Sequence, residues 1–234
     1  MNTHNHANHG VDNSESKLYD SKNDFWEERY ASKDRVWSGS VNRTLADVVT
    51  ELRQVEPKSE DHQALVSLDL GCGEGGDVFW CAENGYKAYG LDVSATAITR
   101  ALKEAKLRNL SSKTRFAVQD LAQWVTTSVE GWPLKYDLIT ASFLPGNVVP
   151  SRTTVLKTAL NRLKSEGSLV LLSHAPLTGP SSSGTPHQGH HRFRTPEEEL
   201  KPLLVDQSEF EIVLAEVRQR DDHLDTVVVL TRAS

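Results

Sequence analysis

Short apolar runs alternate with helix-like periodic segments through the middle of the chain. The apolar runs predict strands at 64–70, 86–92, 114–120, 136–143 and 168–174. The periodic segments predict helices at 75–85, at 94–107 behind a capping Ser94, and from about Thr153 to Leu163 with a stop by Gly167. Parallel strands need crossover connections, which are usually helices, so this alternation predicts a parallel sheet covered on both faces.

The two ends of the chain depart from this alternation. Apolar runs at 210–219 and 224–232 are separated by only a few residues, and so short a link favours an antiparallel hairpin at the sheet edge. Before the sheet, helical spacing predicts helices around 24–32 and 41–55. We therefore expect an α/β fold, a doubly wound Rossmann-like sheet of seven strands, mostly parallel, with a C-terminal antiparallel hairpin.

Composition divides the chain into three parts. Residues 1–17 are rich in His and Asn and poor in apolar side chains, so we expect a disordered tail. Its histidines have no Cys or carboxylate at ligand spacing, so no metal site is expected there. Residues 18–63 predict a helical cap segment, and 64–234 a single domain.

The overall charge and the cysteines narrow the partners and the compartment. A net charge of −6 gives no general attraction to nucleic acid, and a small-molecule partner fits better. No apolar run approaches the roughly 20 residues that span a bilayer, and no apolar segment after the start resembles a secretion signal. With only Cys72 and Cys81, we expect a cytoplasmic protein without a disulfide framework or a membrane partner. The oligomeric state is left open.

A glycine-rich turn follows the first predicted strand, at residues 69–77. Glycines let the backbone approach a ligand closely, although such a turn also fits NAD or FAD sites or a purely structural bend. Asp69, Glu74 and Asp77 lie in or beside the turn, and no Lys or Arg occurs from 66 to 86. These carboxylates disfavour a pyrophosphate, whereas S-adenosylmethionine carries a cationic sulfonium and no phosphate.

Acidic residues also follow the next two strands. Asp92 comes 23 residues after Asp69, at a strand end where a carboxylate can accept hydrogen bonds from ribose hydroxyls, with capping of the next helix as the alternative. Asp120 is placed to accept a hydrogen bond from the adenine amine, and Leu121 to pack on the ring. The alternative for Asp120 is an ordinary loop or capping carboxylate.

Residues 66–144 resemble a class I S-adenosylmethionine-dependent methyltransferase, with Asp69-Leu70-Gly71-Cys72-Gly73-Glu74-Gly75 as its first motif. Beyond this region, the chain is similar to the small-molecule branch near tellurite-resistance and thiopurine methyltransferases. The resemblance implies an aromatic residue over the methionyl end of the cofactor, Trp37 by position. The implied S-adenosylmethionine-binding residues are Trp37, Asp69, Gly71, Cys72, Gly73, Asp92, Val93, Asp120, Leu121 and Ser142.

The fourth predicted strand runs into Ser142-Phe143-Leu144-Pro145-Gly146-Asn147, which lacks the Asp/Asn-Pro-Pro-aromatic signature of methyltransferases that act on nucleobase amines. Nucleic acid is therefore not expected as acceptor. This segment forms either the pocket wall beside the transferred methyl group or core packing at Phe143. The loop at 176–194 is long enough to be a binding lid or to be disordered, and we expect it to close over the crevice opposite 25–39.

The implied reaction is an in-line methyl transfer to a small-molecule acceptor, for which a dedicated base is optional. His174, His187, His190 and His191 are the available histidines, and none has convincing catalytic or metal-binding spacing. Two other classes stay open: a non-catalytic S-adenosylmethionine sensor, and an NAD-dependent oxidoreductase, against which the acidic turn and the terminal hairpin argue.

Overall fold

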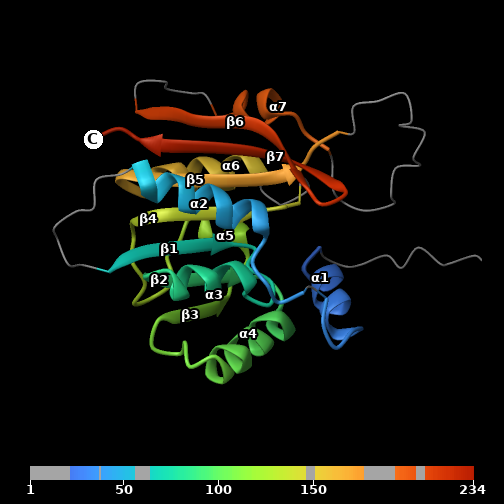
Figure 1. Ribbon diagram of the computed structural model, residues 1–234. Helices are drawn as coiled ribbons and strands as arrows, with labels where there is room; N and C mark the ends of the chain where they lie inside the picture. The colour runs from blue at the N-terminus through green and yellow to red at the C-terminus, as the bar shows by residue number, and fades with distance from the viewer. Residues whose placement is uncertain (1–21, 37, 56–63, 146–150, 177–192, 204–208) are drawn as a thin grey trace, which may run out of the picture.

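The computed structural model describes residues 22–36, 38–55, 64–145, 151–176, 193–203 and 209–234. One seven-stranded sheet in the order β3-β2-β1-β4-β5-β7-β6 forms its centre (Figure 1). The strands are β1 Leu65–Leu70, β2 Tyr86–Asp92, β3 Thr114–Val118, β4 Tyr136–Ser142, β5 Leu163–His174, β6 Phe210–Arg220 and β7 His223–Arg232. Strand β7 runs in the direction opposite to the other six strands. The predicted mostly parallel sheet with a C-terminal hairpin is confirmed.

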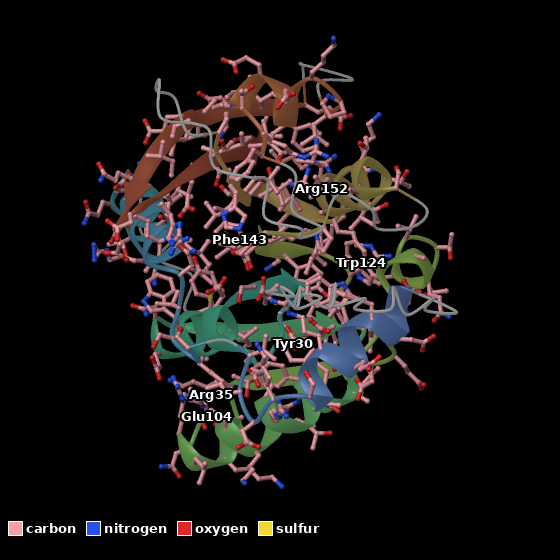
Figure 2. The ribbon with its side chains drawn as sticks, turned by 90° about the vertical axis from the view of Figure 1, so that its right-hand side faces the viewer. Tyr30, Arg35, Glu104, Trp124, Phe143 and Arg152 are labelled. Atoms are coloured by element: carbon pink, nitrogen blue, oxygen red, sulfur yellow. The ribbon has the colours of Figure 1, made fainter. Side chains whose placement is uncertain are left out.

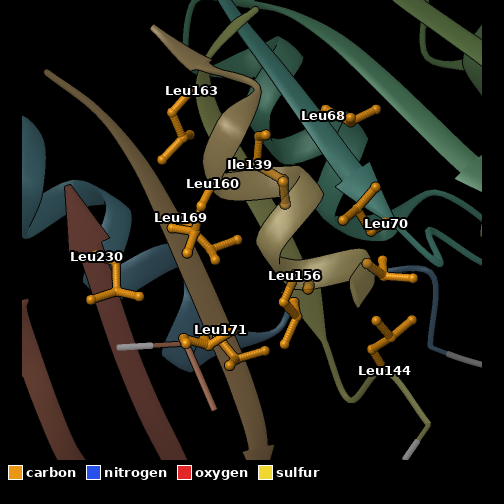
Figure 3. Close-up of a cluster of buried hydrophobic side chains, with 14 of the residues drawn as sticks. Leu68, Leu70, Ile139, Leu144, Leu156, Leu160, Leu163, Leu169, Leu171 and Leu230 are labelled. Atoms are coloured by element: carbon orange, nitrogen blue, oxygen red, sulfur yellow. The ribbon is translucent and has the colours of Figure 1, made fainter. Parts of the chain in front are cut away.

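Helices cover both faces of the sheet. They are α1 Lys22–Ala31, α2 Arg43–Val55, α3 Gly76–Glu83, α4 Ala95–Leu107, α5 Leu121–Trp124, α6 Arg152–Asn161 and α7 Pro196–Leu200. Buried residues of α2, α3 and α4 share one hydrophobic cluster, and those of α5, α6 and α7 share the other. In β5, Leu169 and Leu171 join the second cluster while Val170 and Leu172 join the first, because successive strand side chains point to opposite faces (Figure 3).

Helix α1 lies away from the sheet and packs beside α4 (Figure 1). Its Glu27 carboxylate accepts hydrogen bonds from the Ser94 hydroxyl at 2.6 Å, the Thr96 backbone N–H at 3.2 Å and the Thr96 hydroxyl. A carboxylate at a helix N-terminus satisfies unpaired N–H groups and interacts favourably with the helix dipole. Glu27 thus ties the N-terminal helix to the start of α4.

The boundary between α6 and β5 differs from the prediction. The helix ends at Asn161, and β5 begins at Leu163 rather than at residue 168, so Gly167 lies inside the strand and does not stop a helix. Leu163 pairs with Tyr136 of β4 and is fully buried. The apolar residues that suggested a continuing helix therefore include the first residue of a strand. Pairing with β4 decides between the two structures here.

Two short helices, α5 and α7, were not predicted because four or five residues are too few for a periodic pattern. Within the described part of the chain, no helix combines the length and the apolar character needed to cross a membrane. The expected tail at 1–17 lies outside the described residues.

Candidate functional site

A cavity of about 710 Å³ lies at the carboxyl ends of the parallel strands. Strands β1, β2, β4, β5 and β6 all end at this edge because they run in the same direction, and this is the edge at which open α/β sheets bind ligands. Nine of the ten expected site residues line the cavity: Asp69, Gly71, Cys72, Gly73, Asp92, Val93, Asp120, Leu121 and Ser142. Trp37 lies outside the described residues.

The glycine turn brings bare backbone to the cavity. Gly71 has φ +77°, and the N–H groups of Gly71 and Cys72 both donate to the Leu91 carbonyl, at 2.8 and 2.9 Å. A Cβ on Gly71 would lie 3.3 Å from the Leu144 side chain. Gly73 is also left-handed, with φ +52°. These conformations favour glycine and leave the turn open to a ligand.

Asp92, the last residue of β2, faces the cavity while bracing the turn. One carboxylate oxygen accepts from the Gly73 N–H at 2.8 Å and the other from the Ser94 N–H at 2.9 Å. The cap of α4 is Ser94, whose hydroxyl accepts from the Ala97 N–H at 3.1 Å. Capping, the alternative weighed for Asp92, is therefore done by its neighbour. Burial raises the pKa of Asp92 above its ordinary value.

Two further carboxylates lie behind the turn. Asp69 accepts from the Thr140 hydroxyl at 2.8 Å, and Asp77 accepts from the Ser142 hydroxyl and the Asn42 N–H, both at 2.9 Å. Burial raises the pKa of Asp69 well above its usual range, and the nearby Asp77 carboxylate adds to the rise. Burial raises the pKa of Asp77 too. This end of the cavity therefore favours a cation.

Asp120 is the N-terminal cap of α5, and its side chain accepts from the Ala122 N–H at 2.8 Å. The capping role weighed as an alternative is thus present, and the residue also lines the cavity beside Leu121. Burial raises the pKa of the Cys72 thiol well above its ordinary value, so this side chain is a neutral part of the wall.

Glu74 is the turn carboxylate that faces a cation. Its two oxygens accept from the Val36 N–H at 3.2 Å and from Arg100 Nη1 at 3.0 Å. Arg100 also donates to the Lys33 carbonyl at 2.6 Å. The sequence from 66 to 86 holds no basic residue, but the fold brings one from α4 to Glu74. Glu74 therefore anchors the N-terminal segment.

That segment also supplies cavity walls that the sequence analysis did not single out. Trp26 and Tyr30 of α1 line the cavity, as do residues 38–43. Figure 2 shows Tyr30, a residue of α1, below Phe143 in that view. One sequence signal for these wall residues was available: Asn42 is a typical helix-capping residue before α2, and its side chain accepts from the Leu45 N–H at 3.3 Å.

The end of the cavity beside the β6–β7 hairpin, called here the hairpin end, is lined by Phe143, His174, Arg220, Asp221 and Arg43, while Leu144 lies nearer the glycine turn. Phe143 stacks on His174, with ring centroids 4.4 Å apart and planes at 28°. The Phe143 ring also packs against the sheet core, as one of the two alternatives weighed for it predicts. Its place beside the transferred methyl group, the other alternative, stays a prediction. The sequence analysis did not single out Arg220. It is the last residue of β6, and because β6 runs parallel to β1, this residue lies at the cavity edge of the sheet.

A buried ion pair holds the turn that carries this wall. Arg152, at the start of α6, donates through Nε to the Leu144 carbonyl at 3.1 Å and through two nitrogens to Glu199 of α7 (Figure 2). The side chain of Glu199 is fully buried, and that of Arg152 nearly so. Phe143, just before this turn, has φ +55°, which is costly for an aromatic residue. The ion pair fixes the strained turn from behind.

In the part of the chain that the structure describes, no three His, Cys, Asp or Glu side chains gather in a way that could hold a metal ion. His187, His190, His191 and most of the 176–194 loop fall outside that part. The expected closure of that loop over the crevice therefore stays a prediction.

A family model described as a methyltransferase domain matches residues 61–188. This match spans the glycine turn and the strand ends that carry Asp92, Asp120 and Ser142. No curated protein sequence matches the chain.

Solved methyltransferase structures share the fold. Magnesium protoporphyrin IX methyltransferase (ChlM) from Synechocystis PCC 6803 with bound SAM is 18% identical, with a TM-score of 0.63 over 94% of this chain and 100% of that one. TehB from Haemophilus influenzae is 15% identical, with a TM-score of 0.56 over 89% and 67%. A protein studied for conversion of a disulfide bond into a thioacetal group during echinomycin biosynthesis is 19% identical, with a TM-score of 0.61 over 90% and 91%.

Proposed function

Since the chain belongs to the methyltransferase-domain family, we propose that it binds S-adenosylmethionine in the cavity and transfers the methyl group to a small-molecule acceptor. One observation carries the proposal: strand ends far apart in sequence bring nine of the expected cofactor-binding residues to one cavity. The net charge of −6 supports a small acceptor over a nucleic acid.

The donor set of the glycine-turn end fits this cofactor. S-adenosylmethionine carries a sulfonium and an ammonium group, and the carboxylates of Asp69, Asp77 and Asp92 lie within or just behind the wall. The dipole at the start of α3 would favour a pyrophosphate, but these carboxylates would repel it. The charge distribution therefore supports S-adenosylmethionine over NAD.

Asp92 is the residue that would hold the ribose. Each of its oxygens already accepts one backbone N–H, and a carboxylate has about four lone-pair sites, so each oxygen retains acceptor capacity for a hydroxyl. Asp120 keeps the same capacity after accepting the Ala122 N–H, and it would meet the adenine amine while Leu121 packs on the ring.

The remaining wall would enclose the methionyl part of the cofactor. Gly71, Cys72 and Gly73 would let it lie against the turn, with Val93 near the ribose. Asp69 and Ser142 would face the ammonium group, and Trp37 would cover the methionyl end.

When bound, the cofactor supplies an electrophilic methyl group. The chain's own residues then have three tasks. The glycine turn and Asp92 orient the donor, Phe143 and its neighbours place the acceptor in line, and α1 excludes water. Of the histidines in the described part, only His174 lines the cavity, and its imidazole would take a proton from a hydroxyl or ammonium acceptor.

The first test is ligand binding. S-adenosylmethionine and S-adenosylhomocysteine should raise the melting temperature through mass action on the folded state, whereas NAD should not. If NAD shifts the melt and neither nucleoside does at millimolar concentration, the proposal is wrong.

The second test separates an enzyme from a sensor that binds the cofactor without turnover. Small thiols, metalloid oxyanions, phenols and amines would be screened for release of S-adenosylhomocysteine. Release with any acceptor above the acceptor-free control identifies an enzyme. Cofactor binding without release across the panel would favour the sensor.

A further inference from the structure

The two ends of the cavity differ in charge. Carboxylates line the glycine-turn end: Asp69, Glu74, Asp77, Asp92 and Asp120. The hairpin end presents Arg43 and Arg220. Arg43 lies 3.3 Å from Asp221, and both side chains are 66% exposed, so this pair is largely screened by water. Arg220 is therefore the better shielded cation of the hairpin end.

Arg220 is held in one orientation by a buried carboxylate. Its Nε and Nη2 donate to the two oxygens of Asp225 at 2.6 and 3.2 Å, and the Asp225 side chain is fully buried. Thr44 donates to the same carboxylate at 2.9 Å. A guanidinium fixed in this way loses little further freedom when it binds a ligand, so its geometry is set before the acceptor arrives.

The outer nitrogen of this guanidinium is unused. None of the described residues accepts a hydrogen bond from Arg220 Nη1, although the side chain lines the cavity and is 21% exposed. Charge-assisted hydrogen bonds to carboxylates are the strongest that arginine makes. Asp225 neutralises the pair as a whole, and Asp221, which also lines the cavity, is a second carboxylate near Arg220. Nη1 is thus the part of the guanidinium that is left to bind a ligand anion.

The cavity wall next to Arg220 is aromatic. The guanidinium carbon lies 5.7 Å from the centroid of the Phe143 ring, and that ring stacks on His174. Phe143 directly follows Ser142, which lines the part of the cavity assigned to the cofactor. The Phe143 ring would therefore lie between a group bound to Arg220 and the transferred methyl group. Arg220 would bind a recognition group, and the methylated atom would lie elsewhere on the acceptor.

We propose that the acceptor is a flat aromatic molecule with a carboxylate group apart from its methylated atom. Arg220 binds this carboxylate through Nη1, and the acceptor's ring packs against the Phe143–His174 pair. The inference rests on the proposed function, because it assigns the part of the cavity that the cofactor leaves free.

The test compares matched acids and amides on the protein saturated with S-adenosylhomocysteine. The probes are benzoate and benzamide, 2-naphthoate and 2-naphthamide, and indole-3-carboxylate and indole-3-carboxamide, each measured by ligand-observed NMR titration. In the wild type, at least one acid should bind about tenfold more tightly than its amide, as expected for a charge-assisted hydrogen bond.

Arg220→Met alone would leave Asp225 buried without its cation and risks unfolding, so the variant is Arg220→Met with Asp225→Asn. The preference for acids should fall to about twofold or less in this variant. The control is Arg218→Met. Arg218 lies two residues earlier on β6 and binds Glu51 through two nitrogens, but it does not line the cavity. It should keep the wild-type preference.

Three results would overturn the inference: equal binding of acids and amides by the wild type, an acid preference that survives in the double variant, or no binding of any probe. The affinity for S-adenosylhomocysteine, measured on the same samples, separates this failure from that of the proposed function. A wild type that does not bind the nucleoside contradicts the proposed function. One that binds it without preferring acids contradicts only the assignment of Arg220.

Discussion

Replacing Gly76 with alanine tests how closely the N-terminal segment is docked on the start of α3. A Cβ at this position would lie 2.6 Å from the Ser40 carbonyl oxygen and 3.0 Å from its carbon. Both are backbone atoms, so no side-chain rotation relieves the overlap. Residues 38–43 would have to withdraw by about 0.8 Å to reach an ordinary contact of 3.4 Å.

That withdrawal would act on the cavity. The hydrogen bond from the Asn42 N–H to Asp77, now 2.9 Å long, would lengthen to as much as about 3.7 Å and be lost. A hydrogen bond to a charged group is worth about 1.5–3 kcal/mol, so loss of the contact that shapes this wall should lower the affinity for S-adenosylhomocysteine by up to about 10- to 100-fold. The overlap itself should lower the free energy of unfolding by about 1–3 kcal/mol. Isothermal titration calorimetry and urea denaturation measure the two effects.

Gly131→Ala is the matched control. Gly131 has φ +74°, but a Cβ there meets nothing within 4 Å, so alanine adds only backbone strain of about 1–2 kcal/mol. Its affinity for S-adenosylhomocysteine should stay at the wild-type value. If folded Gly76→Ala also binds within about twofold of wild type, the docking of residues 38–43 does not shape the site.

Three other predictions concern buried charges. Asp92→Ala should weaken S-adenosylhomocysteine binding by about 1.5–3 kcal/mol in calorimetry, and unchanged affinity in a folded variant would leave Asp92 only a brace of the turn. Burial raises the pKa of Asp69, Asp77 and Asp92 above the ordinary 3.8, so the folded, cofactor-free protein holds protons that the unfolded chain releases. The stability that these groups contribute is therefore present below about pH 4 and is lost as the pH rises through their folded pKa values. Because a cationic cofactor favours the ionised carboxylates, the gain in melting temperature from S-adenosylmethionine should grow from about pH 5 to about pH 8 in differential scanning fluorimetry, and a shrinking gain would contradict this sign. Arg152→Met should cost about 3–5 kcal/mol in urea denaturation, because it removes the close cation of the buried Glu199 and leaves it with Arg194 at 3.7 Å, whereas adding Glu199→Leu should restore most of the loss; equal losses in both variants would refute this cause.

Features set by local pattern were predictable from the sequence. The β–turn–α unit around Gly71 and Gly73 and the strand end at Asp92 follow from apolar runs, glycines and acidic residues that are close in the chain. Ser94 was identified as a cap because a hydroxyl before a helical pattern satisfies its first N–H groups, and the structure confirms it. The carboxyl-end rule then places these residues at one edge.

Features that depend on contacts between distant segments were not predictable. Glu27 lies 67 residues from Ser94, and nothing local indicates that its carboxylate meets that helix start. The pairing of Glu74 with Arg100 joins two charges that the sequence pattern treats separately. Burial then decided the strand start at Leu163, which helical periodicity assigned to a helix.

The reversal of β7 also bears on how the protein can be altered. Because β6 ends and β7 begins at the cavity, the turn at Asp221 and Asp222 lies at the hairpin end. This turn joins two antiparallel strands and does not lead into a further parallel strand. The turn residues lie outside the strand pairs, so their side chains can change while a turn of the same length keeps the paired strands in register. The proposed assignment puts acceptor choice and cofactor binding in separable parts of the chain, so grafted hairpin turns should change the acceptor without a change to the glycine turn.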